Sequence, residues 1–259
     1  MSSPKLTILF LHGAYHPPAC YAALTAQLEA VGLEVVAPRL ASLGADARGT
    51  LEDDLAVVRT AAQGLFDSGK NVVIVAHSYG GFVAMNVAGS LTAAAAAREE
   101  KGGLVSIVYI SGLLVSKGSI ALVGCNPKLV GEGEPDLAEV FDVQIKDGLP
   151  VATLKDNERT RYYYHEPAPA EDVDRIVALL EPQCAAVFYI PSPVGPSDVR
   201  VRQTYISPEE DHAVLPEAQE RAVAEGNMKV VKIPGCGHAP FLNNPQEVAG
   251  IIIETIGWE

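Results

Sequence analysis

Three residues of this chain have types and an order that could perform chemistry, namely Ser78, Asp211 and His238. A serine hydroxyl is a poor nucleophile until a histidine takes its proton and a carboxylate fixes the tautomer of that histidine. Ser78 lies between Ala76 and Gly80, which are small enough for a strand and a helix to approach each other at a tight turn. This arrangement is typical of a nucleophile elbow, so we expect Ser78 to be the nucleophile.

The base is expected late in the chain. His238 follows an apolar run over residues 229–233, and Gly235 and Gly237 allow its segment to bend the imidazole towards the serine. His212 is the competing histidine, but it lies in the segment that is expected to supply the acid. His238 is therefore preferred as the base.

The acid is expected after the apolar run over residues 203–206, where three carboxylates follow one another: Glu209, Glu210 and Asp211. Asp211 is preferred because residues 211–216 lead into the next helix, and Glu210 remains an alternative. The chain order of serine, carboxylate and histidine agrees with the architecture in which nucleophile elbows occur.

Alternating strands and helices must position these residues. Apolar runs that are typical of strands cover residues 6–11, 34–37, 72–75, 105–110, 203–206 and 229–233. Apolar residues at helical spacing mark residues 21–30, 51–66 and 82–91, and the last helix could continue to Gly102. The sequence therefore predicts an α/β fold with a mostly parallel sheet covered by helices on both faces.

The alternation breaks between residues 114 and 196, where Gly and Pro are frequent and only one helix, over residues 170–180, is clear. We expect a single domain whose core comprises residues 1–113 and 197–259, with an inserted segment, residues 114–196, that forms a lid. An irregular insertion of this size is usually functional. Ligands bind at the carboxyl edge of open α/β sheets, so the lid is expected over that edge.

Several short segments together make the chain similar to a known family. They comprise residues 11–14, residues 76–81, residues 205–206 with 211–214, and residues 237–241 with 245–247. The chain resembles serine hydrolases of the α/β-hydrolase fold, of the capped kind that includes plant methylesterases, hydroxynitrile lyases and many microbial esterases. The resemblance covers essentially the whole chain. It implies that Ser78 is the nucleophile, Asp211 the acid and His238 the base. It also implies an oxyanion hole formed by the backbone N–H groups of Ala14 and Tyr79.

Substrate contacts are expected from side chains next to these groups. Tyr15 lies beside a proposed oxyanion donor, and Leu113 comes shortly after a predicted strand. An aromatic cluster at residues 162–164 includes Tyr163 and Tyr164, which could line an apolar pocket or hold the lid to the core. All four residues are therefore candidates for the pocket wall.

The remaining histidines are interpreted as structural. His12 and Gly13 are expected to shape the turn that carries the expected donor Ala14, called the oxyanion turn below. Glycine permits unusual dihedral angles, and an imidazole can bind nearby backbone. His77 should point away from the pocket, because neighbouring side chains on a tight turn diverge. His16 and His165 have no spacing that assigns them a role, and we expect them to be exposed or packed in the lid.

The composition excludes several classes of function. The 19 basic and 32 acidic residues give a net charge of −13, which disfavours nucleic acids and anionic membranes as partners. No apolar run approaches the roughly 20 residues that span a bilayer, so we expect a soluble cytoplasmic protein. The 4 cysteines are scattered, which indicates neither a metal site nor a disulfide framework. We expect no cofactor and a small-molecule substrate, and we leave a homodimer open.

These observations favour a hydrolase that cleaves a carboxylic ester or lactone of a small, partly apolar molecule through an acyl-enzyme on Ser78. Carbon–carbon bond hydrolysis by the same residues is an alternative. Cyanohydrin cleavage is disfavoured, because Ala239 stands where the hydroxynitrile lyases carry a lysine. An alternative of another class is a ligand receptor that keeps a hydrolase pocket without turnover.

Overall fold

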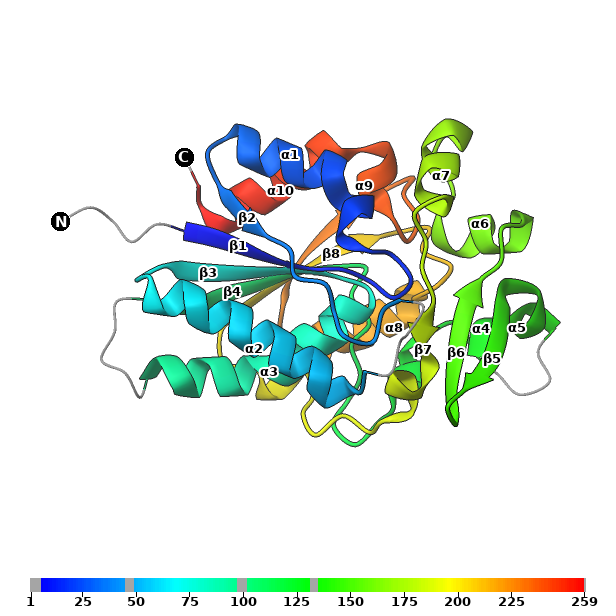
Figure 1. Ribbon diagram of the computed structural model, residues 1–259. Coiled ribbons are helices and arrows are strands. Elements are labelled where there is room, and N and C mark those ends of the chain that lie inside the picture. Colours follow the sequence, from blue (N-terminus) through cyan, green and yellow to red (C-terminus); the bar gives the residue numbers. More distant parts are fainter. Residues whose placement is uncertain (1–5, 45–48, 97–101, 131–134, 259) are drawn as a thin grey trace.

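Six parallel strands form the main sheet of the protein (Figure 1). The computed structural model describes residues 6–44, 49–96, 102–130 and 135–258. In spatial order the strands are β2 (Glu34–Val36), β1 (Leu6–Leu11), β3 (Asn71–His77), β4 (Gly103–Ile110), β8 (Arg202–Pro208) and β9 (Lys229–Ile233). Every neighbouring pair is parallel, which confirms the predicted fold class.

Alternation of side chains along the strands divides the core into two halves, one on each face of the sheet. On β1, Ile8 and Phe10 pack into one half, whereas Leu9 and Leu11 pack into the other. The first half is covered by α1 (Ala22–Ala30) and α10 (Pro245–Ile256) (Figure 1). The second is covered by α2 (Leu51–Asp67), α3 (Tyr79–Ala96) and α8 (Pro216–Gly226).

The inserted segment has more regular structure than the sequence predicted. It contains a three-stranded antiparallel sheet of β5 (Phe141–Lys146), β6 (Leu149–Leu154) and β7 (Gln183–Cys184). Its α-helices are α4 (Pro127–Val130), α5 (Pro135–Val140), α6 (Glu158–Tyr164) and α7 (Ala170–Val177). The expectation of a single clear helix over residues 170–180 was therefore wrong.

The sequence contains a local signal for the β5–β6 hairpin that the sequence analysis did not use. Asp147 and Gly148 connect the two strands, and both have positive φ angles, of 50° and 81°. Asp-Gly is a strong signal for a two-residue hairpin turn, because such a turn needs residues that tolerate positive φ at both central positions. The alternating side chains of the flanking strands could have completed this prediction.

Short elements complete the chain. One further α-helix is α9 (Pro240–Asn243), and 3₁₀ turns occur at Pro18–Tyr21, Ala121–Gly124, Ala185–Tyr189 and Pro196–Asp198. The predicted extension of α3 to Gly102 falls partly on residues 97–101, which lie outside the described residues. Along the described parts of the chain, no helix is both long and apolar enough to cross a bilayer.

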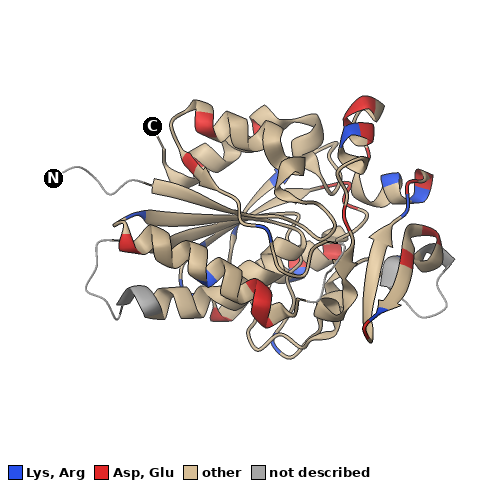
Figure 2. Ribbon diagram, in the orientation of Figure 1, with Lys and Arg blue, Asp and Glu red and all other residues tan. Residues whose placement is uncertain are grey.

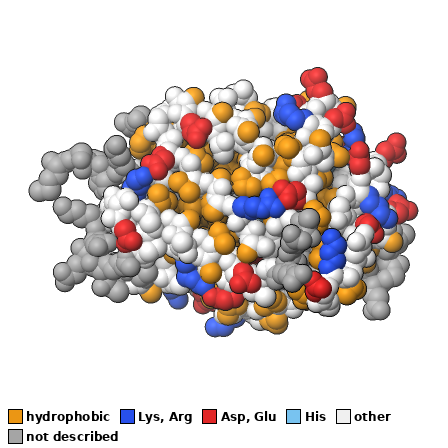
Figure 3. Space-filling view, viewed as in Figure 1, with side chains coloured by type: hydrophobic (Ala, Val, Ile, Leu, Met, Phe, Trp, Pro, Cys, Tyr) orange, Lys and Arg blue, Asp and Glu red, His pale blue; other side chains and the backbone are white. Residues whose placement is uncertain are grey.

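The surface is charged and mixed in character. Figure 2 shows acidic and basic residues interspersed on α6 and α7. On the face drawn in Figure 3, hydrophobic side chains form small patches between charged ones.

Candidate active site

Ser78 lies at the turn between β3 and α3. Its φ angle is 51°, in the left-handed region that side chains rarely adopt, as a nucleophile elbow requires. Gly80 explains why the turn can be so tight, because a Cβ atom there would lie 2.4 Å from the carbonyl oxygen of Leu11 at the end of β1. The close approach of α3 to β1 therefore sets the position of the serine.

A continuous chain of hydrogen bonds joins the three residues with predicted chemistry. His238 Nε2 lies 2.9 Å from Ser78 Oγ, and His238 Nδ1 lies 3.0 Å from each carboxylate oxygen of Asp211. His238 is 2% exposed and Asp211 is 1% exposed. Because a carboxylate accepts the Nδ1 proton, Nε2 is left to accept the proton of the serine hydroxyl.

The surroundings of Asp211 distinguish it from its neighbours. Its Oδ1 accepts the backbone N–H groups of Ala213 and Val214, each at 2.9 Å, and its Oδ2 accepts the Gln219 side-chain amide at 3.1 Å. Glu210, the alternative acid, has an exposed side chain. The structure therefore brings Asp211, and not Glu210, to the histidine.

His212, the alternative base, is also turned elsewhere. Its ring stacks on that of Tyr162, with a centroid distance of 4.2 Å and an interplanar angle of 12°. This contact joins α6 to the segment that carries Asp211.

The turn after β1 is held by two histidines. His12 Nδ1–H donates to the carbonyl of Gly13 at 2.8 Å, and His12 Nε2 accepts the N–H of Leu40 at 3.0 Å. His16 Nδ1–H donates to the carbonyl of Ala14 at 2.7 Å. Because the Gly13 carbonyl and the Ala14 N–H belong to one planar trans peptide, holding the first fixes the direction of the second.

The two predicted oxyanion donors remain available in this network. Ala14 and Tyr79 both line the cavity in front of Ser78, and Tyr79 is the first residue of α3, where an N–H has no partner within the helix. Among the described residues, neither backbone N–H has a hydrogen-bond acceptor outside a helix or strand. Both backbone N–H groups therefore remain candidates for the two oxyanion donors.

His77 connects the turn after β1 to the loop of His238. Its Nε2–H donates to the carbonyl of His238 at 2.9 Å, so its Nδ1 accepts the hydroxyl of Tyr21 at 2.8 Å. The Tyr21 oxygen in turn accepts the N–H of Gly13 at 2.8 Å. Burial lowers the pKa of His77 well below its usual value and keeps the ring neutral. As predicted, His77 points away from the cavity.

Asp54 on the first turn of α2 holds the residue that follows the serine. Its carboxylate accepts the Tyr79 hydroxyl at 2.8 Å and the Ser42 hydroxyl at 2.6 Å, and it is buried. Burial raises the pKa of Asp54, which these hydrogen bonds oppose. Nothing in the sequence alone linked this carboxylate to Ser78.

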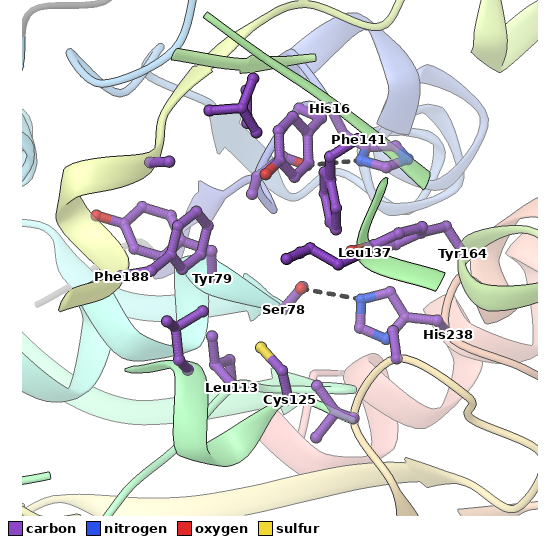
Figure 4. A pocket seen from close by; sticks show the side chains of 18 of the residues that line it. His16, Ser78, Tyr79, Leu113, Cys125, Leu137, Phe141, Tyr164, Phe188 and His238 are labelled. Atoms are coloured by element: carbon purple, nitrogen blue, oxygen red, sulfur yellow. Dashed lines mark hydrogen bonds between the residues drawn. The ribbon is translucent and has the colours of Figure 1, made fainter. Parts of the chain in front are cut away.

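A cavity of about 570 Å³ opens in front of Ser78. Figure 4 shows the rings of Phe141, Tyr164 and Phe188 around the serine, whose hydroxyl faces His238. None of the described residues that line the cavity is Lys, Arg, Asp or Glu. Its size is typical of a small-molecule site, and its wall suits a neutral, largely apolar ligand.

Three of the four remaining candidates for the pocket wall line this cavity: Tyr15, Leu113 and Tyr164. The fourth, Tyr163, does not, and its side chain packs into the hydrophobic core. Consecutive residues on a helix point in directions about 100° apart, so α6 presents Tyr164 to the cavity and turns Tyr163 away. The prediction for Tyr163 is corrected accordingly.

His16 is a cavity residue that the sequence reasoning missed. Its ring lines the cavity, and its Nε2 accepts the Nε2–H of His165 at 3.1 Å. Both rings are buried. His165 lies within the inserted segment, which agrees with one of the two predicted alternatives, whereas His16 is neither exposed nor part of that segment, so the prediction was wrong for His16 alone. The spacing of His16, two residues after Ala14, could have suggested a role at the oxyanion turn.

The buried histidines should make the protein sensitive to acid. Burial lowers the pKa of His12 and of His16 from 6.5 to about 4. Between these values the unfolded chain binds more protons than the folded chain, so the free energy of unfolding falls as the pH falls. The shift of one such histidine corresponds to ~3 kcal/mol. We expect the urea midpoint to decrease between pH 6.5 and pH 4.

The variant His16→Asn provides the comparison for this measurement. Asparagine can still donate to the Ala14 carbonyl but does not titrate. The urea midpoint of the variant should therefore depend less steeply on pH than that of the wild-type protein. An equally steep dependence in the variant would show that His16 does not contribute.

In the described parts of the chain, no group of at least three His, Cys, Asp and Glu side chains is arranged to hold a metal ion.

Comparison with known proteins places this site in a family. The sequence model of the Alpha/beta hydrolase family matches residues 8–251. The chain is 27% identical to alpha/beta hydrolase nvfD of Aspergillus novofumigatus, over 98% of this chain and 97% of that protein. It is 28% identical to pFDCC methylesterase MES16 of Arabidopsis thaliana, over 99% of this chain and 97% of that protein.

The fold is also similar to solved structures. A pyrethroid hydrolase from Sphingobium faniae JZ-2 superposes with a TM-score of 0.75 at 20% identity, over 98% of each chain. The parallel sheet, the elbow and the match over residues 8–251 lead to one conclusion. The chain belongs to the alpha/beta hydrolase family.

Proposed function

We propose that the protein is a serine hydrolase that cleaves a carboxylic ester, or a lactone, of a neutral and largely apolar small molecule. The observation that carries this proposal is the hydrogen-bonded series Asp211, His238 and Ser78, which ends in a cavity with no charged side chain among its described lining residues. Relatives named as a methylesterase and a pyrethroid hydrolase support ester hydrolysis.

The proposed reaction begins when His238 Nε2 takes the proton of Ser78 Oγ as that oxygen attacks the ester carbonyl. The backbone N–H groups of Ala14 and Tyr79 stabilise the negative charge that forms on the carbonyl oxygen. His238 then gives the proton to the departing alcohol, which leaves an acyl group on Ser78. Water, deprotonated by His238, releases the acid and restores the hydroxyl. Asp211 stabilises the imidazolium in both steps.

The inserted segment is proposed to act as the lid of this site. It supplies 11 of the 20 described residues that line the cavity. The reaction centre itself is built by residues outside this segment. The shape of the lid is therefore proposed to select the substrate.

Covalent labelling tests the proposed nucleophile. A fluorophosphonate reacts with a serine only when a neighbouring base activates it. We expect intact mass spectrometry to show one adduct on the wild-type protein and none on Ser78→Ala. An absence of labelling on both proteins would contradict the proposal and would favour a receptor that binds small apolar molecules without turnover.

A further inference from the structure

The β5–β6 hairpin carries an apolar surface that continues the wall of the cavity to the outside. On β5, Phe141, Val143 and Ile145 alternate with Asp142 and Gln144, so the two sets point to opposite faces of the hairpin. The first set shares its face with the residues paired to it on β6, because directly opposed residues lie on the same side of a sheet. Those partners are Leu154, Ala152 and Pro150.

The inner part of this face belongs to the cavity. Phe141 and Val143 on β5 line it, as do Ala152 and Pro150 on β6. Phe141 also packs against Tyr15, beside the oxyanion turn, with a ring centroid distance of 5.7 Å. The apolar surface of the hairpin therefore begins in the cavity that contains Ser78.

The outer part of the same face is exposed. Val143 is 53% exposed although it lines the cavity, and Ile145, paired with Pro150, is 71% exposed. Two further lining residues, Leu137 and Tyr189, are 36% and 61% exposed. Single exposed apolar residues need no explanation, but Val143, Leu137 and Tyr189 all line the same cavity, and Ile145 is paired with Pro150, which lines it too.

We propose that this face of the hairpin, from Phe141 to Ile145, binds an extended apolar chain of the ester substrate that projects beyond the cavity. This proposal rests on the proposed function and specifies its substrate class: neutral esters with a long hydrocarbon substituent. Ile145 is the outermost contact. The face is continuous with the cavity, and a neutral chain suits a wall without charged side chains among the described residues. The net charge of −13 disfavours an anionic lipid surface as the occupant.

The test compares two substitutions on neighbouring residues of β5. Ile145→Thr keeps a β-branched side chain suited to a strand but makes it polar, and Gln144→Thr is the matched control on the opposite face. We would measure kcat/KM for p-nitrophenyl esters from acetate to decanoate, below the concentrations at which they aggregate.

A chain bound along the hairpin predicts a selective effect. For Ile145→Thr, kcat/KM should fall about three- to tenfold with decanoate, because one buried methylene contributes about fourfold to affinity. Acetate is too short to reach Ile145, so its kcat/KM should not change, and Gln144→Thr should behave as wild type with both esters. An equal loss with both esters, or no loss with either, would overturn the proposal.

Binding measurements separate this proposal from the proposed function. Calorimetric titration of the Ser78→Ala protein with methyl acetate and methyl decanoate requires no turnover. We expect Ser78→Ala to bind methyl decanoate more tightly than methyl acetate. Loss of this difference in the double variant that carries both Ser78→Ala and Ile145→Thr would support the hairpin site, even if the wild-type protein hydrolysed no ester. Hydrolysis without any dependence on chain length would uphold the proposed function and overturn the hairpin site.

Two other occupants of the apolar face give distinct results. If Ile145 mattered only above the aggregation concentration of the ester, the face would contact lipid aggregates. If its effect appeared only at high protein concentration, the face would join two copies of the chain. Either result would overturn the proposal.

Discussion

The variant Asp211→Asn is expected to lower kcat by about 10⁴-fold, the largest effect of a substitution that preserves shape at this site. Asp211 is surrounded by donors: the N–H groups of Ala213 and Val214, the amide of Gln219 and the Nδ1–H of His238. An asparagine must turn its NH₂ group towards some of these. If it faces the imidazole, the ring proton moves to Nε2, and the histidine can no longer accept the proton of Ser78.

Steady-state hydrolysis of p-nitrophenyl acetate measures this loss. The matched control is Glu210→Gln, which changes the exposed neighbouring carboxylate and should retain the kcat of the wild type. Similar thermal unfolding of the two variants would show that both fold. A small effect of Asp211→Asn with a large effect of Glu210→Gln would instead identify Glu210 as the acid.

The second large effect is expected from a single methyl group at Gly80. In Gly80→Ala the new Cβ atom would lie 2.4 Å from the carbonyl oxygen of Leu11 and 2.7 Å from that of His12. Both are backbone atoms of the segment that leads to the oxyanion turn, so α3 and β1 must separate. We expect a loss of about 1–3 kcal/mol in the free energy of unfolding. Because the displacement alters the position of Ser78, kcat/KM should also fall about 100-fold.

Gly89 offers the control on the same helix. A Cβ atom at Gly89 would meet no other atom within 4 Å, so Gly89→Ala tests the effect of the substitution without the close approach. Alanine favours a helix by about 1 kcal/mol over glycine, so this variant should be as stable as the wild type or more stable. Urea unfolding and esterase assays of both variants make the comparison. Equal effects of the two substitutions on stability and activity would show that the close approach of α3 to β1 does not cause the losses in Gly80→Ala.

The core of the fold was predictable because its signals are local. The central strands β1 and β3 are short apolar runs buried along almost their whole length, and parallel strands covered on both faces need no other pattern. The positions of Ser78 and His238 were predictable for a related reason, since each follows such a run within a few residues. Their catalytic roles stay predictions until they are tested.

The cavity wall was not predictable in the same way. Tyr163 and Tyr164 are identical in chemistry, and only the placement of α6 against the core decides which of them faces Ser78. His16 and His165 meet across a sequence separation of 149 residues, which no local pattern reveals. The turn at Asp147 and Gly148, which joins the two strands of the hairpin that supply part of the wall, could have been predicted from its residue types.

The pairing of β1 with β3 has a consequence for how this protein can acquire new substrates. Leu11 and Ala76 are opposed in the register, and Ala14 and Tyr79 each follow three residues later. The spacing between the proposed oxyanion donors is thus set by two adjacent strands deep in the sheet, whereas more than half of the described cavity wall comes from the inserted segment.

Under the proposed function, the reaction and the choice of substrate would therefore depend on different parts of the chain. A transplanted inserted segment from a relative could change the range of esters accepted while the strand register preserved the chemistry. The contacts of the inserted segment with the loop of Asp211 would have to be kept, namely the stacking of Tyr162 on His212 and the hydrogen bonds of Asn126. Asn126, within the inserted segment, donates its backbone N–H to the carbonyl of Ala213 and its side-chain amide to the carbonyl of His212, each at 2.7 Å. Through these two bonds, the inserted segment also braces the loop of Asp211.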